Sequence, residues 1–172
     1  MKTLKSIALL ALTLVFINCG EGEKKEEKEQ VKLQSNSTAT SSENKVDENV
    51  TEVVLLANDQ MKFNKDEIRV PAGKTVKFTL KHTGQQPVEV MGHNFVLLVQ
   101  GTEIPAFAAK ASAARDNDYI PEDTDAVIEH TKMLGGGQTT TIEFEPPAPG
   151  TYDFICSFPG HYSLMQGKFI VE

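Results

Sequence analysis

The chain of 172 residues contains no tryptophan and only two cysteines. It also has no excess of basic residues, since 17 Lys and Arg stand against 24 Asp and Glu, for a formal net charge of -7. Nucleic-acid binding needs basic stripes that neutralise phosphates, and the sequence shows none, so nucleic acid is not expected as a partner. Cys19 and Cys156 stand in very different contexts, so we do not expect a disulfide between them.

The first 18 residues have the features of an export signal. Lys2 and Lys5 make a positive start, and residues 7–17 form a nearly continuous apolar run. This run is too short to span a bilayer comfortably, so residues 1–18 are predicted to be a signal peptide rather than a membrane helix. Cys19 follows directly, which predicts its lipidation and a stable membrane anchor. The alternative is a plain cleaved signal followed by an incidental cysteine.

Residues 19–52 differ in composition from the rest of the chain. They are rich in Lys, Glu, Ser, Thr and Asn and contain no aromatic residue. Such a segment buries too little apolar surface to offset the entropy lost on ordering. We therefore predict a disordered tether behind a lipidated Cys19, in a protein exported to the periplasmic or cell-surface side of a bacterial membrane.

Residues 53–172 contain many short β-rich runs, such as TVKFTL and TTTIEFE, separated by Gly- and Pro-containing turns. This pattern predicts one all-β domain, a Greek-key β-sandwich. Residues 88–99 read as one of its β-rich runs. The alanine-rich residues 104–114 predict one short helical flap inserted between strands.

A cysteine, a histidine and a methionine stand close together in the stretch CSFPGHYSLM. Cys156 ends a predicted strand, and His161 and Met165 follow in a loop with a Pro-Gly turn. A second imidazole is available from His93, in the predicted β-rich run 88–99. Neighbouring strands of a sandwich can bring residues this far apart in sequence together, so we expect the four side chains to form one metal site.

Two imidazoles, one thiolate and a weak thioether form the ligand set of a blue-copper electron-transfer site. The thiolate is soft, and neutral imidazoles suit both copper oxidation states. Zinc is the rival metal, but a methionine is a poor zinc ligand, so Met165 favours copper.

Each of these residues, taken singly, is more often structural than a ligand. A buried cysteine usually acts as a small hydrophobe, and a methionine usually fills a core. Nucleophilic Cys/His catalysis is another reading of the pair. However, the sequence shows no third orienting residue or oxyanion motif, and catalysis leaves Met165 unexplained. The joint spacing therefore favours the metal site.

The folded part, residues 53–172, resembles the azurins, which are cupredoxins, or type 1 blue copper proteins. The resemblance rests on the stretches NDQMKF, VMGHNFVLL, VIEHTK and FICSFPGHYSLMQGKF. It implies about eight strands, and it implies that Asn94, which is not itself a ligand, ties the two ligand loops together. It also implies that one Cu(I)/Cu(II) ion is held by Gly92 (through its carbonyl), His93, Cys156, His161 and Met165.

The resemblance further implies an apolar docking patch around His161, and two more histidines match those of azurins. Neither His82 nor His130 is assigned to the metal; His82 could titrate or be purely structural. The patch is expected to consist of Met61, Met91, Phe158 and Pro159.

The chain departs from azurins at two places. Thr51 and Gly73 fall near the positions of the family's disulfide, and Phe95 replaces its core tryptophan. Neither change touches an expected ligand. The anchor and tether resemble those of lipid-modified azurins.

These features predict a membrane-tethered electron carrier of the cell envelope that is not an enzyme. Its partners would be redox proteins such as a cytochrome c, a reductase, a peroxidase or an oxidase. The alternative is a copper storage or delivery protein of the cell envelope, and a third reading is a binding module with a structural metal.

Overall fold

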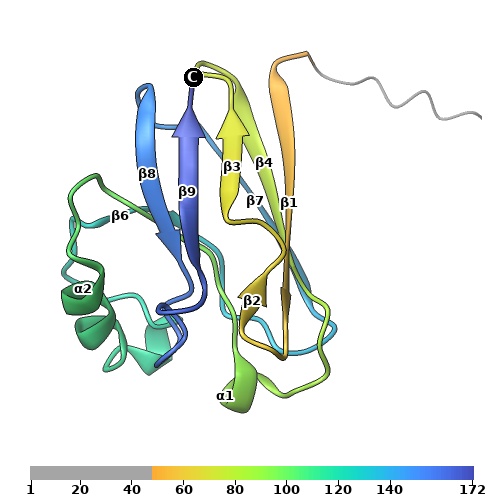
Figure 1. The fold of residues 1–172 in the computed structure, drawn as a ribbon, viewed down its shortest axis with the longest axis vertical. Helices are drawn as coiled ribbons and strands as arrows, with labels where there is room; N and C mark the ends of the chain where they lie inside the picture. The colour runs from red at the N-terminus through yellow and green to blue at the C-terminus, as the bar shows by residue number, and fades with distance from the viewer. Residues whose placement is uncertain (1–47) are drawn as a thin grey trace, which may run out of the picture. The chain divides into compact units, whose positions relative to one another are not determined.

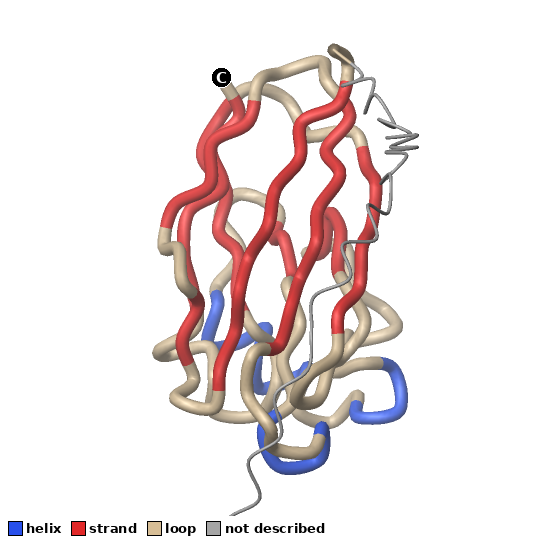
Figure 2. The backbone as a smooth tube through the Cα atoms, turned by 90° about the vertical axis from the view of Figure 1, so that its right-hand side faces the viewer, coloured by secondary structure: helices blue, strands red, loops and turns tan. Residues whose placement is uncertain are grey.

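The computed structural model describes residues 48–172, so the predicted signal peptide, Cys19 and most of the predicted tether lie outside the described residues. Two β-sheets face each other, and the helices gather at the end opposite the C-terminus (Figures 1 and 2). No helix within residues 48–172 has the length and apolarity needed to cross a membrane. The elements are β1 (Val50–Asn58), β2 (Lys62–Phe63), β3 (Glu67–Val70), β4 (Thr75–His82), α1 (Val88–Met91), β5 (Val96–Leu98), α2 (Ile104–Ala111), η1 (Arg115–Asn117), β6 (Val127–His130), β7 (Thr139–Phe144), β8 (Gly150–Ile155) and β9 (Gln166–Val171).

The strand order is β2-β1-β4-β7 in one sheet and β3-β9-β8-β5-β6 in the other. β1 pairs with β4 in parallel, as does β3 with β9, whereas the other pairs are antiparallel. Parallel neighbours that are not joined by a hairpin require the chain to cross between sheets, as in Greek-key sandwiches. The predicted all-β sandwich is confirmed, with nine strands in the described residues instead of about eight.

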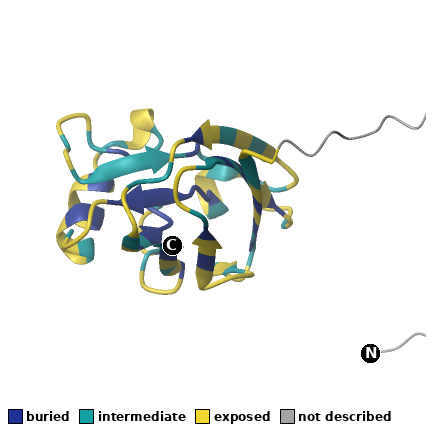
Figure 3. Cartoon of the chain, turned by 90° about the horizontal axis from the view of Figure 1, so that it is seen from above, coloured by how far each residue is buried: buried dark blue, intermediate teal, exposed yellow. Residues whose placement is uncertain are grey.

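Strand burial follows the period of two that the sequence predicts. In β4, Val76, Phe78, Leu80 and His82 are buried, and the residues between them are not. Figure 3 shows that buried residues are concentrated in the strands, while the loops are mostly exposed, and the buried residues of both sheets form one apolar cluster. Alternation of this kind fits a sheet with one face on the core and one toward solvent.

Aromatic rings fill the centre of the sandwich. Phe95 is fully buried and stacks on Phe78 with ring centroids 4.0 Å apart, and its ring lies 5.5 Å from that of Phe154. Full burial of one such side chain contributes about 1.5–3 kcal/mol. Phe95 thus fills the position at which the resemblance expects a tryptophan.

The prediction that residues 88–99 form a β-strand is wrong for the first half of this segment. Its pattern alternates like a strand, but Pro87 starts the helical turn α1, because its carbonyl accepts the N–H groups of Val90 and Met91 at 3.0 Å. No residue of α1 is buried, so the alternation there does not mark a core-facing strand. Only Val96–Leu98 forms β5, and His93 joins Leu134 in an isolated β-bridge.

Two predicted boundaries also move. β1 begins at Val50, inside the predicted tether, because residues 50–57 pair with Thr75–His82 along the whole of β4. This parallel pairing includes Thr51, one of the two positions at which the resemblance expects a cysteine. The helical flap α2 ends at Ala111, and its last turn tightens into i→i+3 hydrogen bonds that continue into η1.

Candidate metal centre

Cys156, His161 and Met165 belong to one short loop that is held together by its own backbone hydrogen bonds. The N–H of Cys156 donates to the carbonyl of Met165 at 2.9 Å, and the N–H of Met165 donates to the carbonyl of His161 at 2.8 Å. Gly160 turns the loop with a φ of 82°, a left-handed conformation that favours glycine. The spacing of Cys156, His161 and Met165 is therefore a local property of the loop between β8 and β9.

His93, the expected imidazole ligand from outside this loop, is positioned by the backbone of another segment. The β-bridge to Leu134 holds His93 by two backbone hydrogen bonds, of 3.0 and 2.8 Å. The Nδ1 atoms of His93 and His161 lie 3.2 Å apart, and they lie 3.8 and 3.7 Å from the Sγ of Cys156. These three donors form a compact triangle, and each residue is at most 3% exposed.

This triangle fits a metal ion. A point equidistant from the three donor atoms lies about 2.1 Å from each, close to the 2.0–2.3 Å that imidazole nitrogen and thiolate sulfur adopt around a bound metal. One soft thiolate and two imidazoles suit copper. The three donor atoms are therefore spaced for direct coordination of one metal ion.

Gly92 contacts the triangle through its carbonyl, and Met165 belongs to the same buried cluster as Cys156. The carbonyl oxygen of Gly92 lies 3.8 Å from the Sγ of Cys156. A Cβ on Gly92 would collide with the carbonyl of Val88 and the ring of Phe158, so this close approach requires glycine. Met165 is fully buried in the same apolar cluster as Cys156.

The hydrogen bond on the far side of the His93 ring sets its tautomer. Nε2 of His93 lies 2.9 Å from the carbonyl oxygen of Asn58, which can only accept a hydrogen bond. The neutral ring therefore carries its proton on Nε2 and presents the Nδ1 lone pair to the triangle. Metal-binding histidines are commonly oriented by such a bond to a carbonyl group.

Asn94 connects the two segments that carry the ligands. Its side chain accepts the N–H of Ser157 at 2.9 Å and donates to the Ser157 hydroxyl at 2.8 Å and the Asp118 carbonyl at 3.0 Å. Ser157 follows Cys156, and Asn94 follows His93. These hydrogen bonds therefore fix the position of the Cys156 thiol relative to the His93 ring. The sequence analysis did not identify Ser157 or Asp118; no sequence motif marks them.

Burial keeps the donors uncharged when no metal is bound. It lowers the pKa of His93 and His161 to about 4, and it raises the pKa of the Cys156 thiol to about 12. At neutral pH both imidazoles are therefore ready to bind a metal, whereas the thiol must release its proton on binding. Metal uptake thus liberates a proton.

These histidine pKa values predict that the metal-free protein loses stability in mild acid. Between about pH 6.5 and 4 the unfolded chain binds more protons than the folded one, so the free energy of unfolding falls as pH falls through this window. The slope should reach up to about 1.4 kcal/mol per pH unit for each imidazole. Urea unfolding of the metal-free protein at several pH values from 4 to 7 measures the slope of the unfolding free energy with pH. His161→Asn should halve the slope, and a slope unchanged in this variant would contradict the prediction.

The predicted docking residues are only partly accessible. Pro159 is exposed, but Met61, Met91 and Phe158 are half-buried. Phe158 packs on the His161 ring with centroids 4.6 Å apart, so part of its role is structural. Two apolar side chains that the sequence analysis did not single out are more exposed: Val90 at 56% and Leu164 at 61%. Nothing in the sequence around Val90 or Leu164 indicates that these apolar side chains are exposed.

The two remaining histidines lie outside the triangle. His82 is fully buried, and its ring stacks on that of His93 with centroids 4.5 Å apart. His130 is half-buried at the end of β6, and its Nδ1 lies 3.2 Å from the carbonyl oxygen of Thr131.

A β-sandwich with a buried Cys-His-His triangle at one end defines the class of a small mononuclear metalloprotein. Comparison with known proteins is more specific. The chain belongs to the plastocyanin/azurin family of copper binding proteins, whose sequence model matches residues 49–172. The predicted copper cofactor is therefore confirmed, and the cluster of His93, Cys156 and His161 is typical of type 1 sites.

Known relatives and solved structures agree with this assignment. The chain is 41% identical over 119 residues to Azurin-1 of Alcaligenes xylosoxydans xylosoxydans, covering 67% of this chain and 92% of that protein. It is 42% identical over 115 residues to Outer membrane protein H.8 of Neisseria gonorrhoeae, covering 65% of this chain but only 62% of that protein's length. The crystal structure of reduced auracyanin from Roseiflexus castenholzii aligns at a TM-score of 0.64 with 35% identity, covering 71% of this chain and 97% of that one.

Proposed function

We propose that the protein is a type 1 blue copper protein that carries single electrons between redox partners in the cell envelope. The observation that carries this proposal is the compact triangle of His93, Cys156 and His161, which is buried at one end of the sandwich. Copper bound there supplies a one-electron couple between Cu(II) and Cu(I). Proteins of this family are generally electron carriers and not enzymes.

The residues around the triangle would hold the donors in place while an electron moves. The Asn58 carbonyl orients His93, and Asn94 ties the Cys156 loop to the His93 segment. Cys156 also belongs to the buried apolar core, which would restrict the access of solvent to the metal. A storage or delivery protein needs exchangeable coordination, and donors that are at most 3% exposed do not favour it. Addition of Cu(II) to the purified domain should produce the intense visible absorption and EPR spectrum of a type 1 site; their absence would reject the proposal.

We further propose that Met165 and the Gly92 carbonyl would be weak additional ligands of the copper. Met165→Leu should keep the blue colour but raise the reduction potential by tens of millivolts, because it removes a weak donor that stabilises Cu(II) more than Cu(I). For one electron, about 59 mV corresponds to a tenfold change in equilibrium. Cyclic voltammetry of the two proteins measures the shift, and an unchanged potential would place Met165 away from the metal.

We propose that the protein is exported and anchored to a membrane by a lipid on Cys19, with residues 20–49 as the tether. Support comes from the sequence of this segment and from the similarity to proteins named Outer membrane protein H.8. Cys19→Ala should release the protein from the membrane fraction or block its processing. Mass spectrometry of the mature N-terminus tests this, and an unmodified N-terminus elsewhere would contradict lipidation.

A membrane-anchored carrier would exchange electrons with redox proteins of the same compartment, such as a cytochrome c, a reductase, a peroxidase or an oxidase. We propose that they dock on the patch formed by Met61, Met91, Phe158 and Pro159, extended by Val90. His161, at 3% exposure, is the least buried of the three donors and would be the exit for the electron.

A further inference from the structure

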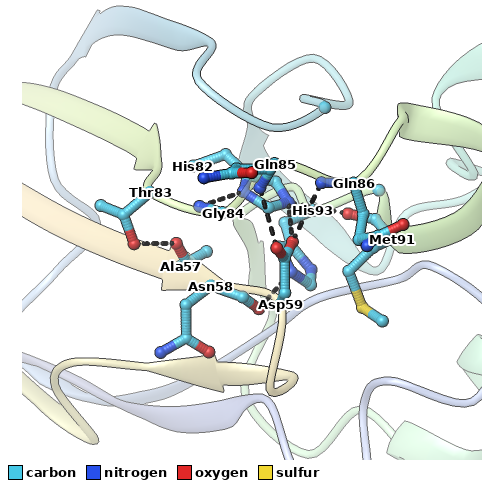
Figure 4. A network of polar contacts seen from close by, with 12 residues as sticks. Ala57, Asn58, Asp59, His82, Thr83, Gly84, Gln85, Gln86, Met91 and His93 are labelled. Carbon is cyan, nitrogen blue, oxygen red and sulfur yellow. Dashed lines mark hydrogen bonds and ion pairs between the residues drawn. The ribbon is translucent and has the colours of Figure 1, made fainter. Parts of the chain in front are cut away.

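The end of β1 holds the segment that leads to His93 at several points (Figure 4). The carbonyl of Ala57 accepts the N–H of Thr83 at 2.8 Å and the Thr83 hydroxyl at 2.9 Å. The carbonyl of the next residue, Asn58, accepts the proton on Nε2 of His93. Both acceptors belong to the backbone, so no side-chain substitution removes them directly.

The third consecutive residue, Asp59, makes a similar link through its side chain (Figure 4). One carboxylate oxygen accepts the N–H of Gln85 at 2.8 Å, and the other accepts the N–H of Gln86 at 3.3 Å. The bond from Gln85 is the main cause that lowers the pKa of Asp59. A Cβ on Gly84 would collide with this carboxylate, so the close approach of the two turns requires glycine.

His82 extends this link to the other side of the His93 segment. Its Nδ1 accepts the N–H of Gly84 at 3.0 Å, so the neutral ring carries its proton on Nε2, which donates to the carbonyl of Met91 at 2.8 Å. Oδ1 of Asp59 lies 3.9 Å from the same Nε2. The carboxylate therefore holds the turn whose backbone orients His82, and His82 in turn contacts both the Met91 peptide and the His93 ring.

We propose that Asp59 is a positioning residue of the metal centre, which fixes residues 84–93 against the end of β1 and thereby sets the place of His93 and the Gly92 carbonyl relative to Cys156. The proposal rests on the proposed ligation of copper by His93. Two backbone N–H donors converge on the two oxygens of one carboxylate. Asparagine has almost the same size, but it offers only one acceptor oxygen, and its NH₂ group would face the second donor. Asp59→Asn therefore breaks one of the two hydrogen bonds and sets an NH₂ group against a backbone N–H, with little change in volume.

The test compares Asp59→Asn with the wild type in both copper-loaded and metal-free full-length protein. The rate of copper transfer to a chelator should rise about tenfold or more, as is usual when a group that orients a ligand is removed. The thiolate-to-copper absorption band should shift, and amide hydrogen exchange at Met91 and His93 should accelerate in the metal-free protein.

Two controls separate positioning from general effects on stability and charge. Tyr152→Phe removes the hydrogen bond to the Ala148 carbonyl without touching residues 84–93. Asp153→Asn removes a carboxylate whose partner is the surface Lys168. Neither control should move the absorption band or the exchange at Met91 and His93.

If Asp59→Asn leaves the band, the copper transfer rate and the amide exchange at the level of the controls, the proposal is overturned. Should that variant not fold, Gly84→Ala displaces the carboxylate while keeping its charge, and it should give the same three changes. A wild-type protein that bound no copper would refute the ligation by His93. The amide exchange of the metal-free protein would still decide whether Asp59 holds the segment.

Discussion

Cys156→Ser is expected to abolish the intense blue absorption of the copper-loaded protein while leaving the sandwich folded. Cys156 is the one sulfur donor in the triangle with His93 and His161, and it is fully buried. Serine is nearly the same size, but its hydroxyl is a hard and weak donor that cannot supply a thiolate-to-copper transition. Visible absorption after Cu(II) addition, with circular dichroism as a check on folding, measures the outcome.

A matched control lies in the same loop. Ser163 is exposed, and its hydroxyl donates to the Gly160 carbonyl at 3.3 Å, so Ser163→Ala should keep the colour. A folded Cys156→Ser protein that remained blue would reject Cys156 as the thiolate donor and, with it, the proposed type 1 site.

Met91→Lys is expected to slow reduction by a redox partner about tenfold or more without a large change in the absorption spectrum. Met91 is half-buried at the end of α1, beside the 56% exposed Val90, and its carbonyl oxygen, which the substitution keeps, accepts the hydrogen bond from His82. A new charge on an apolar docking surface must be desolvated in each encounter. About 1.4 kcal/mol of such cost lowers the rate tenfold.

Stopped-flow reduction at matched potential and ionic strength measures this effect. Val54→Lys is the control, because Val54 is 48% exposed in the middle of β1 and carries no part of the proposed patch. Equal rates for Met91→Lys and Val54→Lys would show that electrons leave elsewhere. Phe158→Lys is less informative, because the Phe158 ring packs on His161 and against Gly92, so its loss would disturb the metal centre itself.

The loop from Cys156 to Met165 could be interpreted from the sequence because its geometry is local. Hydrogen bonds within the loop, such as that from the Met165 N–H to the His161 carbonyl, follow from the short spacing and the Pro-Gly turn. The residue types then restrict the chemistry, since thiolate, imidazole and thioether together favour copper. The distance of His93 from this loop could not be predicted in the same way, because it depends on the bridge to Leu134 and the pairing of β5 with β8.

The segment Val88–Met91 shows where pattern reasoning fails. Its alternating residues predict a strand, yet it forms a helical turn that buries none of its side chains. The Pro87 carbonyl accepts two hydrogen bonds within the turn, and the remote Gly135 packs closely against Val88. The contact with Gly135 joins distant parts of the chain, and no periodicity in the sequence records it.

The sequence by itself determined the all-β class, through alternation of apolar residues, and the donor types, through the side chains of one short loop and one distant histidine. Only the tertiary structure decided that the His93 and His161 nitrogens lie 3.2 Å apart and that the Asn58 carbonyl orients the His93 ring. It also decided that burial keeps both imidazoles neutral down to about pH 4. The reason is physical: side-chain chemistry and local spacing are carried by neighbouring residues, whereas distance, tautomer and pKa depend on groups that strand pairing brings together from remote parts of the chain.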